Sequence, residues 1–445
     1  MGIRFVAEYY DVKSGHVTES KILRTDKIKR PTTLKEFGYL HSEQIQLLQD
    51  IQDFKLQYEA KLINEESTCP GCGRRTSLRG TRKSNFHAAL TDHKVNIQRR
   101  RCQCGWSSPD SVEGIYGSSM HPDLVEKQVL QGAENSYRQA SRQLNAESKK
   151  NRSINNDDRI RHTISEISKI ILEEKLKPCQ AVSKVDAANH LVVVVDGGHL
   201  KSKDNESRSF EAMIATVYRP EYIHRIDKYH NEIIQKTSVA SALSDKQKTI
   251  KKLTSNACRR EGSHVSVTKL TCLTDGASNC WSITNSLKPY CKNLMNVLDW
   301  FHITKRFTII YNHLDDTFKD KLEKVKWFIW HGKAKEGLER LLGLQCIIED
   351  PKLSSNLKDL YQYLERNKEY MVNYQERQEK NLPFTSTYAE SSVNALINAR
   401  QKDNRKMQWT REGAHNILQI RTSRFSKTWD QDWKKAQEKI YRKVA

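Results

Sequence analysis

Three aspartates each follow a short apolar run that is typical of a buried β-strand. Residues 191–195 precede Asp196, residues 269–274 precede Asp275, and residues 293–298 precede Asp299. Strands that are apolar along their whole length are usually buried on both faces of a sheet. We therefore expect the strands to present these carboxylates at an accessible sheet edge.

Clustered carboxylates are suited to holding divalent cations. Two-metal cleavage of a phosphodiester needs acids that hold two Mg²⁺ ions about 3.5–4 Å apart, one at the attacking oxygen and one at the leaving oxygen. Mg²⁺ prefers oxygen ligands and keeps several waters, so two or three acids are enough. A further acid is Glu390, which shares a predicted helix face with Asn394 and Ile397.

Four of the ten cysteines form two tight pairs. They are Cys69, Cys72, Cys102 and Cys104. Two such pairs about thirty residues apart are typical of a zinc ribbon, in which four thiolates close a tetrahedral structural Zn²⁺ site. The second pair has one spacer residue where the first has two, so His87 or His93 could replace one cysteine as a ligand.

The net charge of +21 is concentrated in two segments of the chain. Residues 69–106 hold nine Lys/Arg and one Asp, and residues 400–445 hold thirteen Lys/Arg and five Asp/Glu, so each segment carries +8. Clustered positive charge favours a nucleic-acid partner. The residues expected to contact phosphates are Arg99, Arg100, Arg101, Arg400, Lys402, Arg405 and Lys406.

Several predicted elements position these groups. Residues 3–23 alternate like a hairpin, and a helix over 42–63 has one apolar face. That face consists of Ile45, Leu48, Ile51, Phe54 and Leu62. Helices are predicted within 122–172, the first ending at Gly132, and a long helical stretch follows over 303–374. Thr410 is expected to cap a last helix, with Trp409 packed in the core.

The ordered set of motifs resembles the DDE transposases of bacterial insertion sequences and their Mutator-like relatives. The order is strand-Asp196, strand-Asp275, strand-Asp299-x-x-His302, a helical insertion and helix-Glu390. The cysteine pairs followed by helices resemble the zinc-ribbon and helix-turn-helix front end of several such families. The tail resembles their C-terminal signature in Glu390–Asn394, Asn404–Trp409, Gly413, Ala414 and Arg421, and the whole likeness spans roughly residues 65–425.

The resemblance implies an α/β ribonuclease H-like catalytic domain with an all-α insertion, preceded by a zinc ribbon and a helix-turn-helix-like helical module. The expected segments are 1–66 (hairpin and helix), 67–118 (zinc ribbon), 119–180 (helical DNA-binding module), 188–312 (first part of the core), 313–383 (helical insertion) and 384–445 (catalytic helix and basic tail). Asp196, Asp275 and Glu390 would be the catalytic acids, holding Mg²⁺ or Mn²⁺. Asp299 and His302 would form the accessory motif. Asp275 is preferred over Asp299 as the second acid because its Asp-Gly context repeats that of Asp196.

The function expected from this resemblance is that of an enzyme, a metal-dependent DNA transposase. It would bind the double-stranded ends of its own mobile element, cleave phosphodiester bonds and join 3′-hydroxyl ends to target DNA as a homo-oligomer in a synaptic complex. The sequence shows no export signal or long apolar run, so we expect a cytoplasmic, nucleoid-associated prokaryotic protein without a membrane partner.

Two other functions fit the same residues. A ribonuclease H-like nuclease would cut DNA without joining strands. A non-catalytic regulator derived from a transposase would bind DNA and leave the acids unused.

Overall fold

The computed structural model describes residues 1–149, 151–180, 182–204, 207–226, 231–387, 394–402 and 407–442. Glu390, Arg405 and Lys406, which the sequence analysis singled out, lie outside these ranges. The chain divides into two compact units, Met1–Ile167 with Trp433–Ala445, and Ser168–Asp432. No helix in the described part of the chain is long and apolar enough to cross a membrane.

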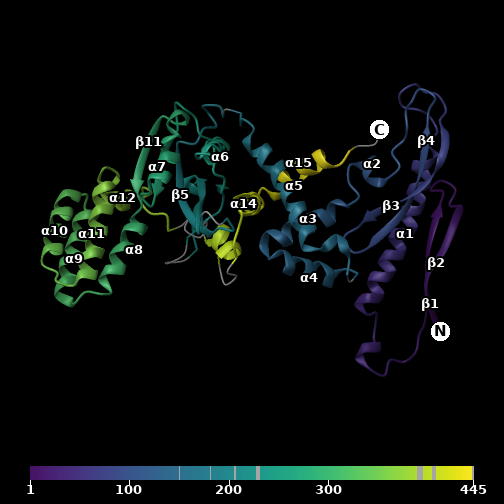
Figure 1. The fold of residues 1–445 in the computed structure, drawn as a ribbon, viewed down its shortest axis with the longest axis horizontal. Helices are drawn as coiled ribbons and strands as arrows, with labels where there is room; N and C mark the ends of the chain where they lie inside the picture. The colour runs from purple at the N-terminus through teal and green to yellow at the C-terminus, as the bar shows by residue number, and fades with distance from the viewer. Residues whose placement is uncertain are drawn as a thin grey trace. The chain divides into compact units, whose positions relative to one another are not determined.

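The first unit contains two β-hairpins and a set of helices. Its elements are β1 (Gly2–Tyr10), β2 (Val17–Lys27), η1 (Leu34–Glu36), α1 (His41–Glu65), β3 (Ser77–His87), β4 (Asp92–Arg101), α2 (Val112–Tyr116), α3 (Pro122–Glu134), α4 (Tyr137–Glu147), η2 (Ser153–Asn155) and most of α5 (Asp157–Leu176). Strands β1 and β2 pair antiparallel, as do β3 and β4. Helix α1 contacts both hairpins (Figure 1).

Helix α1 buries fewer of its apolar side chains than its periodicity predicted. Ile45 and Phe54 are buried, but Leu48, Ile51 and Leu62 are 46–51% exposed. The five residues share one apolar face, as the sequence analysis stated, but only part of that face is buried. The two hairpins cover α1 only in part, and helical spacing cannot show how wide the covering surface is.

Helices α3, α4 and α5 pack through apolar side chains at helical spacing. Ile160, Ile164, Ile167 and Ile171 of α5 recur at helical spacing and are each at most 1% exposed. Gly132 does not end α3, which continues to Glu134. A Cβ at Gly132 would lie 2.6 Å from Ile164 Cδ1, so this glycine permits the close approach of α3 to α5.

The second unit is built around a five-stranded sheet. Its elements are the end of α5, β5 (His190–Lys201), β6 (Ser209–Tyr218), η3 (Pro220–Tyr222), β7 (Ile223–Arg225), β8 (Asn231–Ile233), β9 (Thr237–Ser241), α6 (Lys248–Arg260), β10 (Lys269–Thr274), α7 (Ser278–Asn285), η4 (Lys288–Tyr290), β11 (Asn293–Leu298), α8 (Trp300–Tyr311), α9 (Asp316–Trp330), α10 (Ala334–Cys346), α11 (Pro351–Arg366), η5 (Lys368–Tyr370), α12 (Tyr374–Glu379), η6 (Asn394–Lys402), α14 (Arg411–Phe425) and the start of α15 (Trp429–Ile440).

The strand order of the sheet is β11-β10-β5-β6-β9. Strands β5, β10 and β11 are parallel, and β6 and β9 are antiparallel to their neighbours. Both faces of the sheet are covered, which agrees with the apolar run at residues 191–195 of β5. Val192 and Val194 pack in one core with α8–α11, whereas Leu191, Val193 and Val195 pack in another with α6 and α7.

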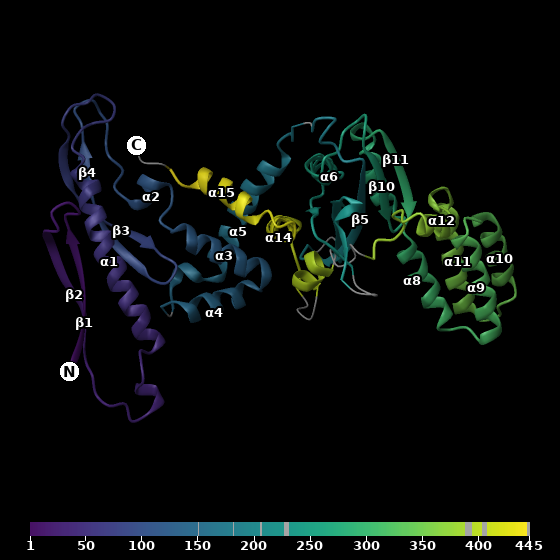
Figure 2. The ribbon, with the colours of Figure 1, turned by 180° about the vertical axis from the view of Figure 1, so that it is seen from behind.

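The long helical stretch after β11 forms α8–α12. Helices α9, α10 and α11 gather next to the β11 edge of the sheet (Figures 1 and 2). Several hydrogen bonds attach this helical block to the sheet region, among them the following two. Tyr374 Oη donates to the Leu298 carbonyl at 2.8 Å, and Trp281 Nε1 donates to Asn367 Oδ1 at 2.9 Å.

Strand β5 continues beyond Asp196, which the sequence analysis had placed at the strand tip. It runs five residues further to Lys201 and pairs with β6 along this extension. The two glycines after Asp196 are strand residues instead of a turn. A Cβ at Gly197 would meet Glu211, and a Cβ at Gly198 would meet Ile397. The glycines therefore make space for side chains that arrive from distant segments.

Candidate functional site

The four paired cysteines lie at one end of the β3–β4 hairpin. Strand β3 begins just after the first pair and β4 ends just before the second, and the pairing of Ser77 with Arg101 brings the two loops together. Gly73 and Gly105, which follow the pairs, adopt positive φ angles of 71° and 94°. This conformation costs glycine little, and it closes both loops in similar turns.

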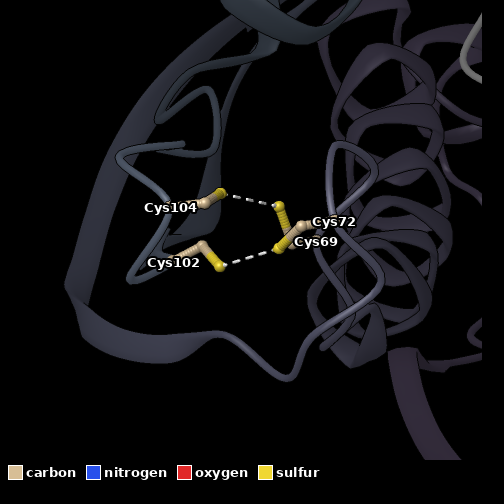
Figure 3. Close-up of side chains that lie close together, drawn as sticks. All are labelled: Cys69, Cys72, Cys102 and Cys104. Atoms are coloured by element: carbon tan, nitrogen blue, oxygen red, sulfur yellow. Dashed lines mark hydrogen bonds between the residues drawn. The ribbon is translucent and has the colours of Figure 1, made fainter.

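The sulfur atoms converge on one point (Figure 3). Cys69 Sγ lies 3.6 Å from Cys104 Sγ, and Cys72 Sγ lies 3.4 Å from Cys102 Sγ. All four sulfurs lie within 4.8 Å of one another. Tetrahedral Zn–S bonds of about 2.3 Å require S···S separations of roughly 3.8 Å. The single spacer of the second pair therefore does not prevent a four-thiolate arrangement, and the cluster is a possible Zn²⁺ site.

Neither His87 nor His93 belongs to this cluster. His87 Nδ1 lies 2.7 Å from an Asp92 carboxylate oxygen, and His93 Nδ1 lies 2.5 Å from Asp53 Oδ1. Both histidines therefore have carboxylate partners of their own. The possibility that one of them replaces a cysteine is wrong for this arrangement, since the four cysteines assemble alone.

The hairpin that carries the cysteines is basic and exposed. Of the predicted phosphate contacts, Arg99 and Arg101 are exposed. Arg100 is half-buried and donates to the Asn64 carbonyl at 2.9 Å, so it stabilises the local fold. Sequence reasoning missed the exposed basic side chains on and before β3, although the charge count included them. They are Arg74, Arg75, Arg79, Arg82 and Lys83.

The three aspartates lie in one region of three neighbouring parallel strands, within β5 and directly after β10 and β11. Val195, Thr274 and Leu298 occupy one row of the sheet, because Thr274 pairs with both of the others. Asp196, Asp275 and Asp299 are the next residues along the chain, Asp196 still within β5 and the other two just past the ends of β10 and β11; this set is called the acidic edge below. The order β11-β10-β5 places Asp275 between the other two acids.

Asp196 and Asp275 are both partly exposed at this edge. Nearby backbone N–H groups donate to their side chains: Gly197 N lies 2.7 Å from Asp196 Oδ1, and Ala277 N lies 2.9 Å from Asp275 Oδ1. Burial raises the pKa of Asp196; the nearby His302 opposes this shift, and the charges of Asp275 and Asp299 add to it. A bound cation would offset this cost of holding negative charges together.

Asp299 has a different environment, since it is fully buried. It caps α8 by accepting from Phe301 N at 3.0 Å, and it accepts from Ser386 N at 2.9 Å and from the Ser386 hydroxyl. His302 Nε2 lies 3.7 Å from Asp299 Oδ2. Burial raises the pKa of Asp299, and the Ser386 and Phe301 bonds oppose that shift. Its oxygens are thus used to attach the segment at 386 to the start of α8.

Glu211 is an acid near this edge that sequence reasoning missed. It lies on β6 opposite His199, and its side chain occupies the space left by Gly197. The Asn279 amide, at the start of α7, donates to it. Burial raises the pKa of Glu211, while His199 lowers it and Asp275 and Asp196 raise it further. The only signal in the sequence that could have pointed to Glu211 was the Gly197-Gly198 pair. Glycines in a strand can indicate that another segment approaches closely, as well as a turn.

The described acids near the edge do not form a compact ligand group by themselves. Within the described ranges, the four cysteines are the one set of three or more His, Cys, Asp or Glu whose ligand atoms all lie within 4.8 Å of one another. The third predicted catalytic acid, Glu390, is outside those ranges. The neighbouring described segment, η6, packs its buried Ile397 on Gly198, two residues from Asp196.

The C-terminal basic residues have mixed placements. Arg400 is fully buried with its guanidinium 4.9 Å from the centre of the Trp409 ring, so it does not face solvent as a phosphate contact requires. Lys402 is exposed. Trp409 is buried in the core, as predicted. Thr410 caps α14 by accepting from Gly413 N at 3.1 Å, which confirms the expected helix start.

A comparison with protein-family models finds no match to this chain, and a comparison with curated proteins finds none either.

Proposed function

We propose that this protein is a metal-dependent DNA transposase that binds the ends of a mobile element, cleaves phosphodiester bonds and joins 3′-hydroxyl ends to target DNA. The observation that carries the proposal is the placement of Asp196 and Asp275 at equivalent positions of two adjacent parallel strands. Both carboxylates are partly exposed there, the strands that carry them are packed on both faces of the sheet, and the two negative charges lie close together.

The sheet topology supports a ribonuclease H-like core. The first three strands are antiparallel neighbours in the order β5, β6, β9, and β10 and β11 add in parallel on the other side of β5. This is the strand arrangement of ribonuclease H-like sheets. The helical block between β11 and the segment at 384 lies where the resemblance implies an insertion.

The donors at the acidic edge fit Mg²⁺ or Mn²⁺. They are hard carboxylate oxygens, and burial disfavours the charged form of Asp196 when no cation is present. Asp196 and Asp275 would hold the metal, with Glu390 as a further ligand. When bound, the metal ions would supply activation of the attacking hydroxyl and stabilisation of the leaving oxygen.

Two neighbouring side chains, Asp299 and His302, would support the proposed metal site without binding the metal. Asp299, which uses its oxygens on Ser386 and Phe301, is better suited to holding the end of β11 against the segment at 386 than to binding metal. This favours Asp275 as the second catalytic acid. His302 would lie beside the site as an accessory group, since its charge acts on the pKa of Asp196.

The first unit would supply DNA recognition. The cysteine cluster would hold Zn²⁺ and fix the hairpin end, and the exposed arginines of that hairpin would contact phosphates. Helices α3–α5 would form a helix-turn-helix-like module. A synaptic complex of two ends would require at least a dimer.

The test is a cleavage and joining assay with Mg²⁺ or Mn²⁺ on plasmids that carry the DNA from both sides of the gene. We expect wild-type protein to nick at the element ends and to join a pre-cleaved end to target DNA. Asp196→Asn and Asp275→Asn should each lower the rate by about 10²–10³-fold, as expected when a group that stabilises transition-state charge is removed. Asp316→Asn, whose side chain is 99% exposed on α9, is the matched control and should keep full activity.

The other two functions give different results in the same assay. Cleavage without joining would favour the nuclease. Specific DNA binding without cleavage, with biological activity retained in Asp196→Asn, would overturn the enzyme proposal in favour of a regulator.

A further inference from the structure

An exposed arginine lies beside the acidic edge. Arg306 is on α8, one helical turn after His302. Its guanidinium carbon lies 3.9 Å from the centre of the Tyr363 ring. Stacking on an aromatic face holds one side of a planar guanidinium and leaves its N–H edge free to meet an anion.

The ring under Arg306 is itself attached to the acidic edge. Tyr363, on α11, is buried, and its hydroxyl donates to the backbone carbonyl of Asp275 at 2.9 Å. Burial raises the pKa of Tyr363, the Arg306 charge opposes that shift, and Asp275 and Asp299 add to it. The position of Arg306 is therefore coupled to that of Asp275 through one buried side chain.

The positive charge of Arg306 is not neutralised within the described part of the chain. No carboxylate of the described residues lies within 4.0 Å of its guanidinium, although three aspartates lie at the edge that its stacking partner contacts. His302 differs in this respect, because its ring lies 3.7 Å from Asp299. An anchored, exposed arginine without a carboxylate partner among the described residues is a suitable receptor for an external anion.

A nucleic-acid strand that approaches this edge meets negative charge and needs a counter-charge. Arg400 does not provide it from the surface, because it is fully buried. We propose that Arg306 binds a backbone phosphate of the strand positioned at Asp196 and Asp275, with Tyr363 fixing the guanidinium for that contact. This inference rests on the proposed function and adds a substrate-binding residue to it.

The experiment compares two stacked arginines. Arg340, on α10, is also exposed and has its guanidinium carbon 4.6 Å from the centre of the Phe328 ring, so Arg340→Gln is a matched control for Arg306→Gln. The first readout is the cleavage rate in Mn²⁺. We expect it to fall about 10–100-fold in Arg306→Gln, the size of effect of losing a hydrogen bond to a charged group. Arg306→Lys should recover part of the rate, and Arg340→Gln should match wild type.

The second readout is the affinity for a DNA duplex in Ca²⁺, measured over a range of salt concentrations. Loss of one phosphate contact should lower the slope of log K against log salt by about 0.9 in Arg306→Gln but not in Arg340→Gln. Thermal melting of each variant checks the fold, and Arg306→Lys, which keeps the charge, should keep the wild-type slope.

The outcomes separate the two proposals. Wild-type rate and slope in Arg306→Gln, with loss of cleavage in Asp196→Asn, would overturn the role of Arg306 and leave the transposase proposal intact. Absence of cleavage by wild-type protein would overturn the transposase proposal. In that case a lower salt slope in Arg306→Gln still supports the phosphate contact, and an unchanged slope overturns it.

Discussion

The cysteine cluster of the first unit and the acidic edge of the second are assembled from the chain in opposite ways. The cluster takes its four side chains from two short loops at one end of a single hairpin. The acidic edge takes its aspartates from three strands, and the insertion of β10 between β5 and β11 makes them neighbours. One site is specified by local spacing and the other by the pairing of distant segments.

The two sites also differ in what holds them together. The four sulfur atoms surround a space of the size that a zinc ion needs, so a bound zinc ion would hold the two loops together. The acidic edge is supported by cores on both sheet faces and keeps its shape while its carboxylates repel one another. With metal bound at both sites as we propose, loss of metal should therefore change the structure of the first site and leave the fold of the second intact.

The largest expected effect is that of zinc removal. Structural Zn²⁺ contributes on the order of 10 kcal/mol to the folding of small zinc domains, so Cys72→Ser or a strong chelator should open the loops around β3 and β4. Hydrogen exchange should rise in residues 67–106 and stay low in β5 and β10. Cys346→Ser, at an exposed cysteine outside the cluster, is the control. Unchanged exchange after complete chelation would contradict a structural role for the metal.

Gly198→Ala tests the contact between β5 and η6. The new Cβ would lie 2.6 Å from Ile397 Cδ1, and overpacking of this kind costs about 1–3 kcal/mol. Ile397→Val should recover part of that loss, which chemical denaturation of both single variants and the double variant can measure. Gly343→Ala in α10, where a Cβ meets nothing within 4 Å, should be neutral or slightly stabilising. Strictly additive effects would show that the two residues do not touch.

Asp299→Asn and Asp275→Asn should separate a carboxylate that stabilises the fold from one that we propose to bind metal. Asn cannot accept every hydrogen bond that Asp299 accepts from Phe301 and Ser386. The free energy of unfolding of the Asp299→Asn variant should therefore be about 2 kcal/mol lower than that of the wild type. Asp275→Asn keeps an acceptor for Ala277 N and relieves repulsion with Asp196, so its stability should be unchanged or higher. Equal destabilisation by both variants, measured by urea denaturation, would remove the distinction.

The smallest expected effect is a pH-dependent gain in stability in Asp196→Asn. Burial raises the folded-state pKa of Asp196 above its ordinary value of 3.8, so the wild type loses stability as the pH rises from that value through the raised pKa. Asp196→Asn should therefore melt a few degrees higher than wild type at pH 7, and the difference should disappear below about pH 4. A difference that does not depend on pH would contradict this origin. Added Mn²⁺ should reduce the difference by stabilising only the wild type.

Much of the local structure could be predicted from the sequence. The isoleucines of α5 recur at helical spacing and are all buried, and the valine run of β5 forms the central strand. These signals succeed because side-chain periodicity reports directly on which faces are covered. The apolar side chains Leu48, Ile51 and Leu62 show the limit of this reasoning, since the surface that meets α1 is narrower than its apolar face.

The sequence by itself determined the ligand types and their local geometry. The cysteine spacing and the following glycines are enough to form the thiol cluster, because all the required constraints lie within two short loops. The apolar runs before the acids likewise determined that buried strands would carry them.

Only the tertiary structure decided which charged groups face one another. Long-range strand pairing placed Asp275 between Asp196 and Asp299, and the close packing allowed by Gly197 brought Glu211 to the edge. The same packing buried Arg400 and left Arg306 exposed on its aromatic support. Such placements depend on register and on the sum of many contacts, which no local pattern of residues encodes.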